Sequence, residues 1–188
     1  PVFLYEEAAT SESRRNLSEI RAGEYEGLAQ KLQDPKWKPD FGPADFRPRS
    51  GAFVIGAREF LIAYNANLNT RDTKIGSEIG LRIRESGRLA KDKDGNKVIG
   101  PDGNPVRVPG RFKNLKAVGW YIEDYGRAQV SMNLTNYKVT PPHVALEAVR
   151  EEAASLGAYV TGSELVGLIP KAALLEAGRY YLKKQGRS

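Results

Sequence analysis

The chain has 188 residues, with 29 Lys and Arg against 23 Asp and Glu, a formal net charge of +6, no Cys and one His. The absence of Cys excludes disulfides, a thiolate nucleophile and Cys-ligated metal sites, and a single His excludes a His–His acid/base pair. The apolar fraction is 40%, with no run of the roughly 18–20 apolar residues that span a bilayer, so the sequence predicts a globular chain of one domain or slightly more.

The first third of the chain predicts one strand and one helix. Residues 2–5 are apolar and form the strand. Residues 11–33 have apolar side chains near helical spacing, although Gly23 and Gly27 weaken the middle of the helix. Because the chain opens in mid-strand at Pro1, we expect it to be part of a longer polypeptide; removal of an initiator Met is the alternative.

Residues 34–51 contain four prolines and cannot sustain a helix or a central strand. The same segment carries Trp37, Phe41 and Phe46. A stiff loop with large apolar faces suits a ligand-facing or interdomain position better than a free linker.

A regular pattern follows from residue 58, and it predicts these elements in chain order: a strand at 60–69, a helix at 72–87 capped by Asp72, strands at 115–122 and 128–139, a helix at 141–157 capped by Thr140, a strand at 159–165, and a helix at 170–182 with Leu174, Leu175 and Tyr180 buried. The β-α-β-β-α-β order is that of the ferredoxin-like α+β fold with an added C-terminal helix, and it predicts an antiparallel sheet covered on one face by two helices.

The positive charge is concentrated in residues 88–116, which hold 8 basic and 3 acidic groups. Asp94-Gly95-Asn96 and Asp102-Gly103-Asn104 are turn signals, so we expect an exposed hairpin or loop. A solvated loop is the favoured interpretation, with polyanion binding as a weaker alternative, because base recognition also needs a docking helix or an aromatic platform.

Chemistry-bearing motifs are sparse. His143 falls in the first turn of a predicted helix, where the macrodipole favours the neutral imidazole, so a structural role is expected. Nucleophile-elbow, phosphate-loop and dinucleotide fingerprints are absent, and Asp92–Asn96 fails the spacing of a calcium loop. The residues alone predict a soluble α/β unit with a rigid aromatic loop.

Several segments, in order along nearly the whole chain, resemble glutamate formimidoyltransferase. The matching segments are Arg14–Glu26, Trp37–Pro43, Gly56–Ala63, Gly119–Tyr121, Ala128–Ser131 and Gly162–Leu168. Residues 88–113 match poorly and read as an insertion.

The resemblance implies a two-subdomain enzyme in which each half is ferredoxin-like. Residues 1–50 would be the end of a truncated N-terminal subdomain with the folate-contacting loop, and residues 51–188 the C-terminal subdomain. The implied activity moves a formimidoyl group between 5-formimidoyltetrahydrofolate and L-glutamate in histidine degradation. Tetrahydrofolate would be the group carrier, without a metal. A cytoplasmic homo-oligomer without nucleic-acid or membrane partners is expected.

The resemblance also places the folate-contacting segment after Pro39-Asp40-Phe41. Its residues are Gly42, Pro43, Ala44, Asp45, Phe46, Arg47, Pro48, Arg49, Ser50 and Gly51. The catalytic His of the family lies upstream of Pro1 and does not correspond to His143, so no catalytic residue is assigned and the chain alone is expected to be inactive. A non-catalytic folate-binding or assembly module is the alternative.

Folate has a flat pterin, an aromatic spacer and an anionic glutamate tail. Three kinds of side chain in this region suit those groups: aromatic rings that could stack (Trp37, Phe41, Phe46), guanidinium groups that could pair with the tail (Arg47, Arg49), and carboxylates that could accept from the pterin amino group (Asp40, Asp45). For each, a core aromatic or a solvated charge is the competing interpretation.

Overall fold

A computed structural model describes residues 1–187, and the chain divides into two compact units, Pro1–Arg58 (unit 1) and Glu59 onward (unit 2). The sequence placed the boundary after residue 50. The structure assigns the next eight residues to unit 1, because Phe53–Ala57 forms a strand parallel to the first strand of the chain. Within residues 1–187, no helix combines the length and apolarity that a membrane crossing requires.

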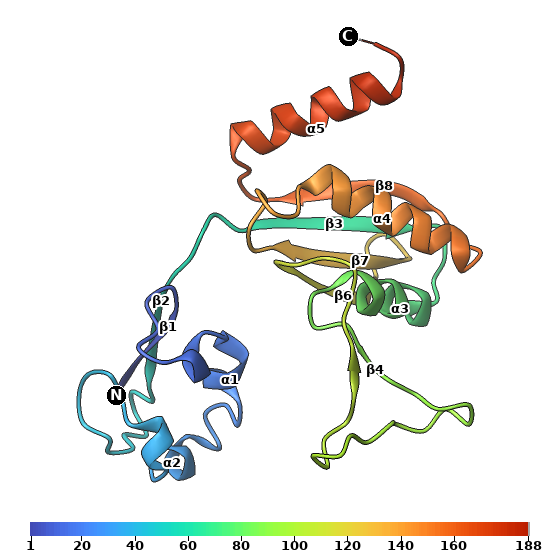
Figure 1. The fold of residues 1–188 in the computed structure, drawn as a ribbon. Coiled ribbons are helices and arrows are strands. Elements are labelled where there is room, and N and C mark those ends of the chain that lie inside the picture. Colours follow the sequence, from blue (N-terminus) through green and yellow to red (C-terminus); the bar gives the residue numbers. More distant parts are fainter. Residues whose placement is uncertain (188) are drawn as a thin grey trace. The chain divides into compact units, whose positions relative to one another are not determined.

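Unit 1 contains short elements connected by long loops (Figure 1). They are β1 (Val2–Glu6), η1 (Glu12–Arg14), α1 (Leu17–Arg21), α2 (Leu28–Lys31), η2 (Pro35–Trp37) and β2 (Phe53–Ala57). The parallel register runs from Val2 opposite Phe53 to Glu6 opposite Ala57. Its core consists of Phe3, Ile20, Leu28 and Leu32. The Pro-rich segment forms only the single turn η2, as expected from its prolines.

The helix predicted for residues 11–33 is wrong, because the chain turns sharply between α1 and α2. Gly23 has φ +85° and Glu24 φ +48°, both in the left-handed region that ends a helix. A Cβ on Gly27 would lie 2.8 Å from the carbonyl oxygen of Gly23, so the two backbone segments touch. The glycines that weakened the helical pattern therefore break it completely.

Unit 2 contains most of the regular structure. Its elements are β3 (Ile62–Leu68), α3 (Thr73–Ile83), β4 (Arg88–Leu89), β5 (Arg107–Val108), β6 (Leu115–Ile122), β7 (Arg127–Leu134), α4 (Pro142–Ser155), β8 (Val160–Val166) and α5 (Lys171–Lys184). Four strands form an antiparallel sheet in the order β6-β7-β3-β8, and α3 and α4 cover one of its faces (Figure 1). The predicted α+β class agrees with this arrangement.

Alternation along the strands builds the core of unit 2. Every second residue of β7, from Ala128 through Val130 and Met132 to Leu134, is buried beneath the helices. Residues of β3, α3 and α4 complete the same cluster. Asp72 caps α3 as predicted, since its side chain accepts a hydrogen bond of 2.8 Å from the backbone N of Lys74.

Glycines allow α3 to lie directly on β6. A Cβ on Gly119 would lie 2.0 Å from the backbone N of Ser77 and 2.2 Å from the carbonyl carbon of Gly76. Only a residue without a side chain fits there. This contact fixes the position of α3 on the sheet.

Three local expectations for unit 2 are wrong. Thr140 does not cap α4; Pro141 occupies the cap, and the Thr140 hydroxyl donates to the carbonyl of Lys113 at 2.6 Å. β7 ends at Leu134, five residues before the predicted end, where a turn begins at Asn136. The three side chains of α5 that were expected to be buried are exposed, Leu174 at 58%, Leu175 at 47% and Tyr180 at 36%, and only Ala173 of that helix is buried.

Candidate functional site

The loop of residues 42–51 belongs to unit 1 and leads from η2 to β2. Gly42 and Gly51, at its two ends, have φ +78° and +57°, a conformation that glycine adopts without strain. Within the loop, the backbone N atoms of Ser50 and Gly51 donate to the carbonyl of Arg47 at 3.1 and 2.9 Å, which closes a turn. Phe46 and Gly51 are half-buried and the other eight residues are exposed.

A buried ion pair holds the start of this loop. The Asp40 carboxylate accepts from Nη1 of Arg14 at 2.7 Å, from the backbone N of Leu4 at 2.8 Å and from the Thr10 hydroxyl. Burial acts to raise the pKa of Asp40, but these hydrogen bonds and the Arg14 charge outweigh it, so the pKa lies below its usual value. Asp40 is thus occupied as an anchor, which disfavours the pterin-contacting role considered for it.

The three aromatic candidates differ in what they already contact. Trp37 packs edge-on against Phe3, and the Lys31 ammonium lies 4.0 Å from its ring centroid. Phe46 packs against Tyr25, with ring centroids 5.7 Å apart. Phe41 is 62% exposed. The structure therefore places Trp37 and Phe46 against the core and leaves the Phe41 ring on the surface.

A cavity of about 540 Å³ opens beside the second half of the loop, entirely within unit 1. Pro48, Arg49, Ser50 and Gly51 form one wall. Other lining residues come from α1, α2 and η2, namely Ile20, Leu28, Lys31 and Trp37, and from the turn between α1 and α2, namely Tyr25. Residues 42–47 do not line the cavity. The Tyr25 hydroxyl donates to the carbonyl of Pro48 at 2.9 Å and so ties the loop to the rim.

Lys31 is the most constrained cation at this cavity. Its ammonium donates to the carbonyls of Glu19, Ile20 and Ala22 at 2.9, 2.6 and 2.9 Å, which are the last carbonyls of α1. Burial lowers the pKa of Lys31, opposed in part by the Glu19 carboxylate. By contrast, no ion pair within residues 1–187 engages Arg47 or Arg49. Arg49 therefore offers an unpaired cation at the cavity wall.

Unit 2 carries a polar network on the sheet face opposite the helices. Gln129, 1% exposed, accepts from Nε1 of Trp120 at 2.7 Å and donates to Asn67 at 2.7 Å. The Glu164 carboxylate accepts from Asn65 at 3.2 Å and from Gln129 at 3.3 Å. The sequence analysis missed this network, because strand register alone brings these residues together. In the sequence, only the polar residues at alternate positions of β3 indicate that one face of the sheet carries a polar network.

His143 is a packing residue in this structure. It is 6% exposed and stacks on Tyr180, with ring centroids 4.6 Å apart. Burial lowers its pKa, so the neutral imidazole is favoured, although Glu176 and Glu147 act in the opposite direction. The structural role expected for His143 agrees with this environment.

Comparison with known proteins divides the chain at nearly the same place as the structure. Residues 1–58 match the model of the formiminotransferase domain N-terminal subdomain, and residues 63–188 match the formiminotransferase domain. Formimidoyltransferase-cyclodeaminase of Dictyostelium discoideum is 48% identical over 98% of this chain and 31% of its own length. Glutamate formimidoyltransferases of Thermoplasma acidophilum and Streptococcus pyogenes are 42% and 37% identical, over 99% and 97% of this chain.

This chain covers 54% of each of those two glutamate formimidoyltransferases, so it spans about a third to a half of the relatives it matches. The two domain matches and these identities agree with the resemblance found in the sequence. The chain belongs to the formiminotransferase family.

Proposed function

We propose that this chain is part of a folate-dependent transferase that moves a formimidoyl group between 5-formimidoyltetrahydrofolate and L-glutamate in histidine degradation. Relatives bearing the name glutamate formimidoyltransferase support the reaction class. The observation that carries the proposal for this chain is the unit 1 cavity, because the loop that the resemblance assigned to folate contributes a whole wall of it. A cytoplasmic location and a homo-oligomeric assembly stay predictions.

Three features of the cavity support folate as its ligand. Its volume of about 540 Å³ falls within the range of small-molecule sites, roughly 300–1,000 Å³. Tyr25 and Trp37 present aromatic surface for a pterin or the aromatic spacer. Arg49 supplies a guanidinium for a tail carboxylate. Residues 42–47, outside the cavity, would contact the ligand from the rim.

Unit 2 carries polar groups of its own, in the network on its sheet. We assign it to the ferredoxin-like fold, supported by the β-α-β-β-α-β order and the β6-β7-β3-β8 sheet. Glu164, oriented by Asn65 and Gln129, would accept hydrogen bonds from an amino group of a substrate. His143 is unsuited to move a proton, since it is buried against Tyr180. The catalytic His would not be among the residues of this chain.

Isothermal titration of the purified protein with 5-formyltetrahydrofolate tests the proposal, because the chain is not expected to turn over alone. Arg49→Gln is expected to weaken folate binding by about tenfold, the equivalent of one charge-assisted hydrogen bond. Lys38→Gln is the matched control, an exposed cation of unit 1 outside the cavity, and should leave the Kd unchanged. The absence of binding, or equal affinities of the wild type and the Arg49→Gln variant, would refute the assignment.

A further inference from the structure

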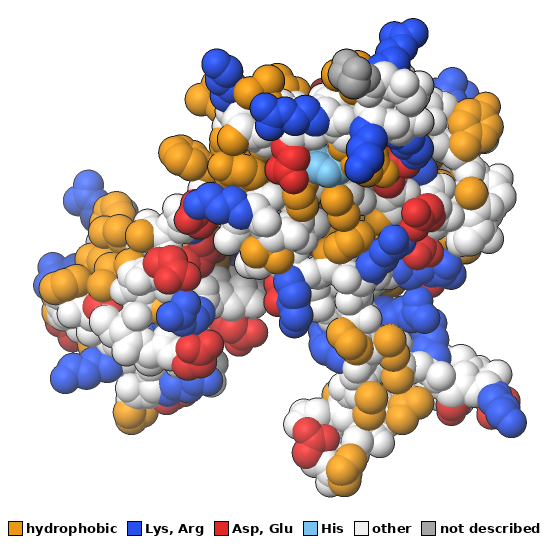
Figure 2. Space-filling view, turned by 45° about the horizontal axis from the view of Figure 1, so that its top comes forward, with side chains coloured by type: hydrophobic (Ala, Val, Ile, Leu, Met, Phe, Trp, Pro, Cys, Tyr) orange, Lys and Arg blue, Asp and Glu red, His pale blue; other side chains and the backbone are white. Residues whose placement is uncertain are grey.

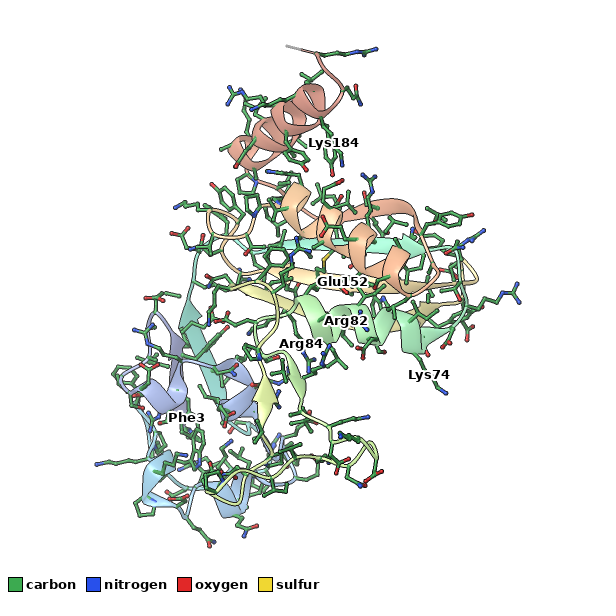
Figure 3. The ribbon with its side chains drawn as sticks, turned by 45° about the vertical axis from the view of Figure 1, so that its right-hand side comes forward. Phe3, Lys74, Arg82, Arg84, Glu152 and Lys184 are labelled. Carbon is green, nitrogen blue, oxygen red and sulfur yellow. The ribbon has the colours of Figure 1, made fainter. Side chains whose placement is uncertain are left out.

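A second pocket, of about 590 Å³, lies in unit 2 at the base of the β4–β5 hairpin, and we call it the hairpin-base pocket. Four cations, Arg84, Arg88, Lys91 and Arg107, line it together with one acid, Glu78. Figure 2 shows Lys and Arg side chains gathered where the hairpin meets the rest of unit 2. Figure 3 shows Arg84 at the end of α3, where the hairpin begins.

Among the described residues, carboxylates engage only one of these four cations, Arg88. Glu78 binds Arg82 at 2.8 Å, and its contact with Arg88 is longer, at 3.5 Å. In the described part of the chain, no carboxylate pairs with any of the other three cations. The pocket therefore has an excess of positive charge that the protein leaves uncompensated.

Two of the guanidinium groups are held in place by the backbone. Nε of Arg84 donates to the carbonyl of Gly87 at 2.9 Å, and Nη1 of Arg107 donates to the carbonyl of Ser86 at 3.1 Å. Burial lowers the pKa of Arg84, and the neighbouring charge of Arg107 lowers it further. Holding two like charges this way costs free energy that a bound anion would offset.

The base of the hairpin is firmly attached to α3. A Cβ on Gly87 would lie 1.9 Å from the carbonyl oxygen of Val108, and one on Gly110 would lie 1.9 Å from that of Arg84. The backbone N of Arg111 donates to the carbonyl of Arg82 at 2.9 Å. These contacts fix the base of the hairpin, whereas residues 91–97 and 101–109 beyond it are exposed, in agreement with the exposed hairpin expected from the sequence.

We propose that the hairpin-base pocket binds a small oligoanion, a ligand with two or more adjacent phosphoryl or carboxylate groups. Leu89 and Val108 give the pocket an apolar wall beside the cations, which suits an anion carried on a partly apolar body. No aromatic side chain lines the pocket, so base stacking by nucleic acid has no platform there. This site is independent of the function proposed for unit 1.

Isothermal titration of the purified protein with tripolyphosphate and with citrate tests the proposal. Comparing the two affinities distinguishes a phosphoryl ligand from a carboxylate ligand. Arg84→Gln with Arg107→Gln should weaken binding by at least about tenfold. The control variant, Lys93→Gln with Lys97→Gln, removes the same charge from exposed positions of the hairpin outside the pocket. It should weaken anion binding by less than about threefold.

Two further measurements keep the test decisive if the double arginine variant folds poorly. Lys91→Glu, at an exposed position of the pocket wall, should also abolish binding. Arg107→Gln alone, which leaves Arg84 in place, should weaken binding less than the double arginine variant does. The proposal would be overturned by equal losses of affinity in both double variants. It would also be overturned if neither anion gave a heat of binding, or if the protein bound duplex DNA in preference to both small anions.

Discussion

Replacing Asp40 by Asn should destabilise unit 1 by about 3 kcal/mol, because it removes one partner of a buried ion pair. The Asp40 side chain is 6% exposed and that of Arg14 is 9% exposed. Removing one member of such a pair typically costs about 3–5 kcal/mol. Arg14 keeps the carbonyls of Lys36 and Lys38 as acceptors, which places the expected cost at the lower end of that range.

Urea unfolding followed by the fluorescence of Trp37 measures this cost. The chain has two tryptophans, so a Trp120→Phe background leaves Trp37 as the reporter of unit 1. Because a unit of this size unfolds with an m value near 1 kcal/mol/M, the midpoint should fall by about 3 M, or unit 1 should unfold without denaturant. Asp45→Asn, at an exposed position of the same loop, is the control and should change stability by less than about 0.5 kcal/mol.

The pH dependence gives an independent test of the same pair. The folded-state pKa of Asp40 is lowered, so its stabilising contribution is complete above the unfolded value of about 3.9 and is lost as the pH falls through the folded pKa. The difference between wild type and Asp40→Asn should therefore shrink below about pH 4. Equal midpoints for the Asp40 and Asp45 variants would refute the reasoning.

Two further predictions concern unit 2. Gly119→Ala should destabilise unit 2 by about 3 kcal/mol or more, since the new Cβ would lie 2.0 Å from the backbone N of Ser77. Gly162→Ala is the control, because its Cβ would have no neighbour within 4 Å, and it should leave the stability nearly unchanged. Thermal unfolding measures both effects. Glu147→Gln should speed amide exchange across α5, because Glu147 accepts from Tyr181 at 3.1 Å and from Lys184, both on that helix; unchanged exchange would contradict this anchoring role.

Strand alternation and the Asp72 cap made much of unit 2 predictable. The bounds of β6 agree with the sequence prediction residue for residue, because Leu115 and Ala117 alternate with exposed neighbours. The failures have local causes. Gly23 adopts a left-handed conformation that ends a helix whose apolar spacing continues beyond it. The apolar residues of α5 have helical spacing, but spacing cannot show whether another element covers them.

The candidate site was predictable only in part. The loop of residues 42–51 came from the resemblance, whereas the facing walls of its cavity come from α1 and α2. Tyr25 and Lys31 reach the cavity only because the chain turns at Gly23. The network of Gln129 and Glu164 depends on strand register between segments far apart in the sequence. Patterns within a short window do not encode such contacts.

The central claim is that the loop of residues 42–51 and the adjoining cavity bind folate. Amide hydrogen exchange of the purified protein, with and without 5-formyltetrahydrofolate, tests this claim most directly. If folate binds there, exchange should slow in residues 42–52 and in residues 20–31 on the facing wall, with smaller effects in the Arg49→Gln variant. Ligand-induced protection that leaves both segments of unit 1 unchanged would contradict it.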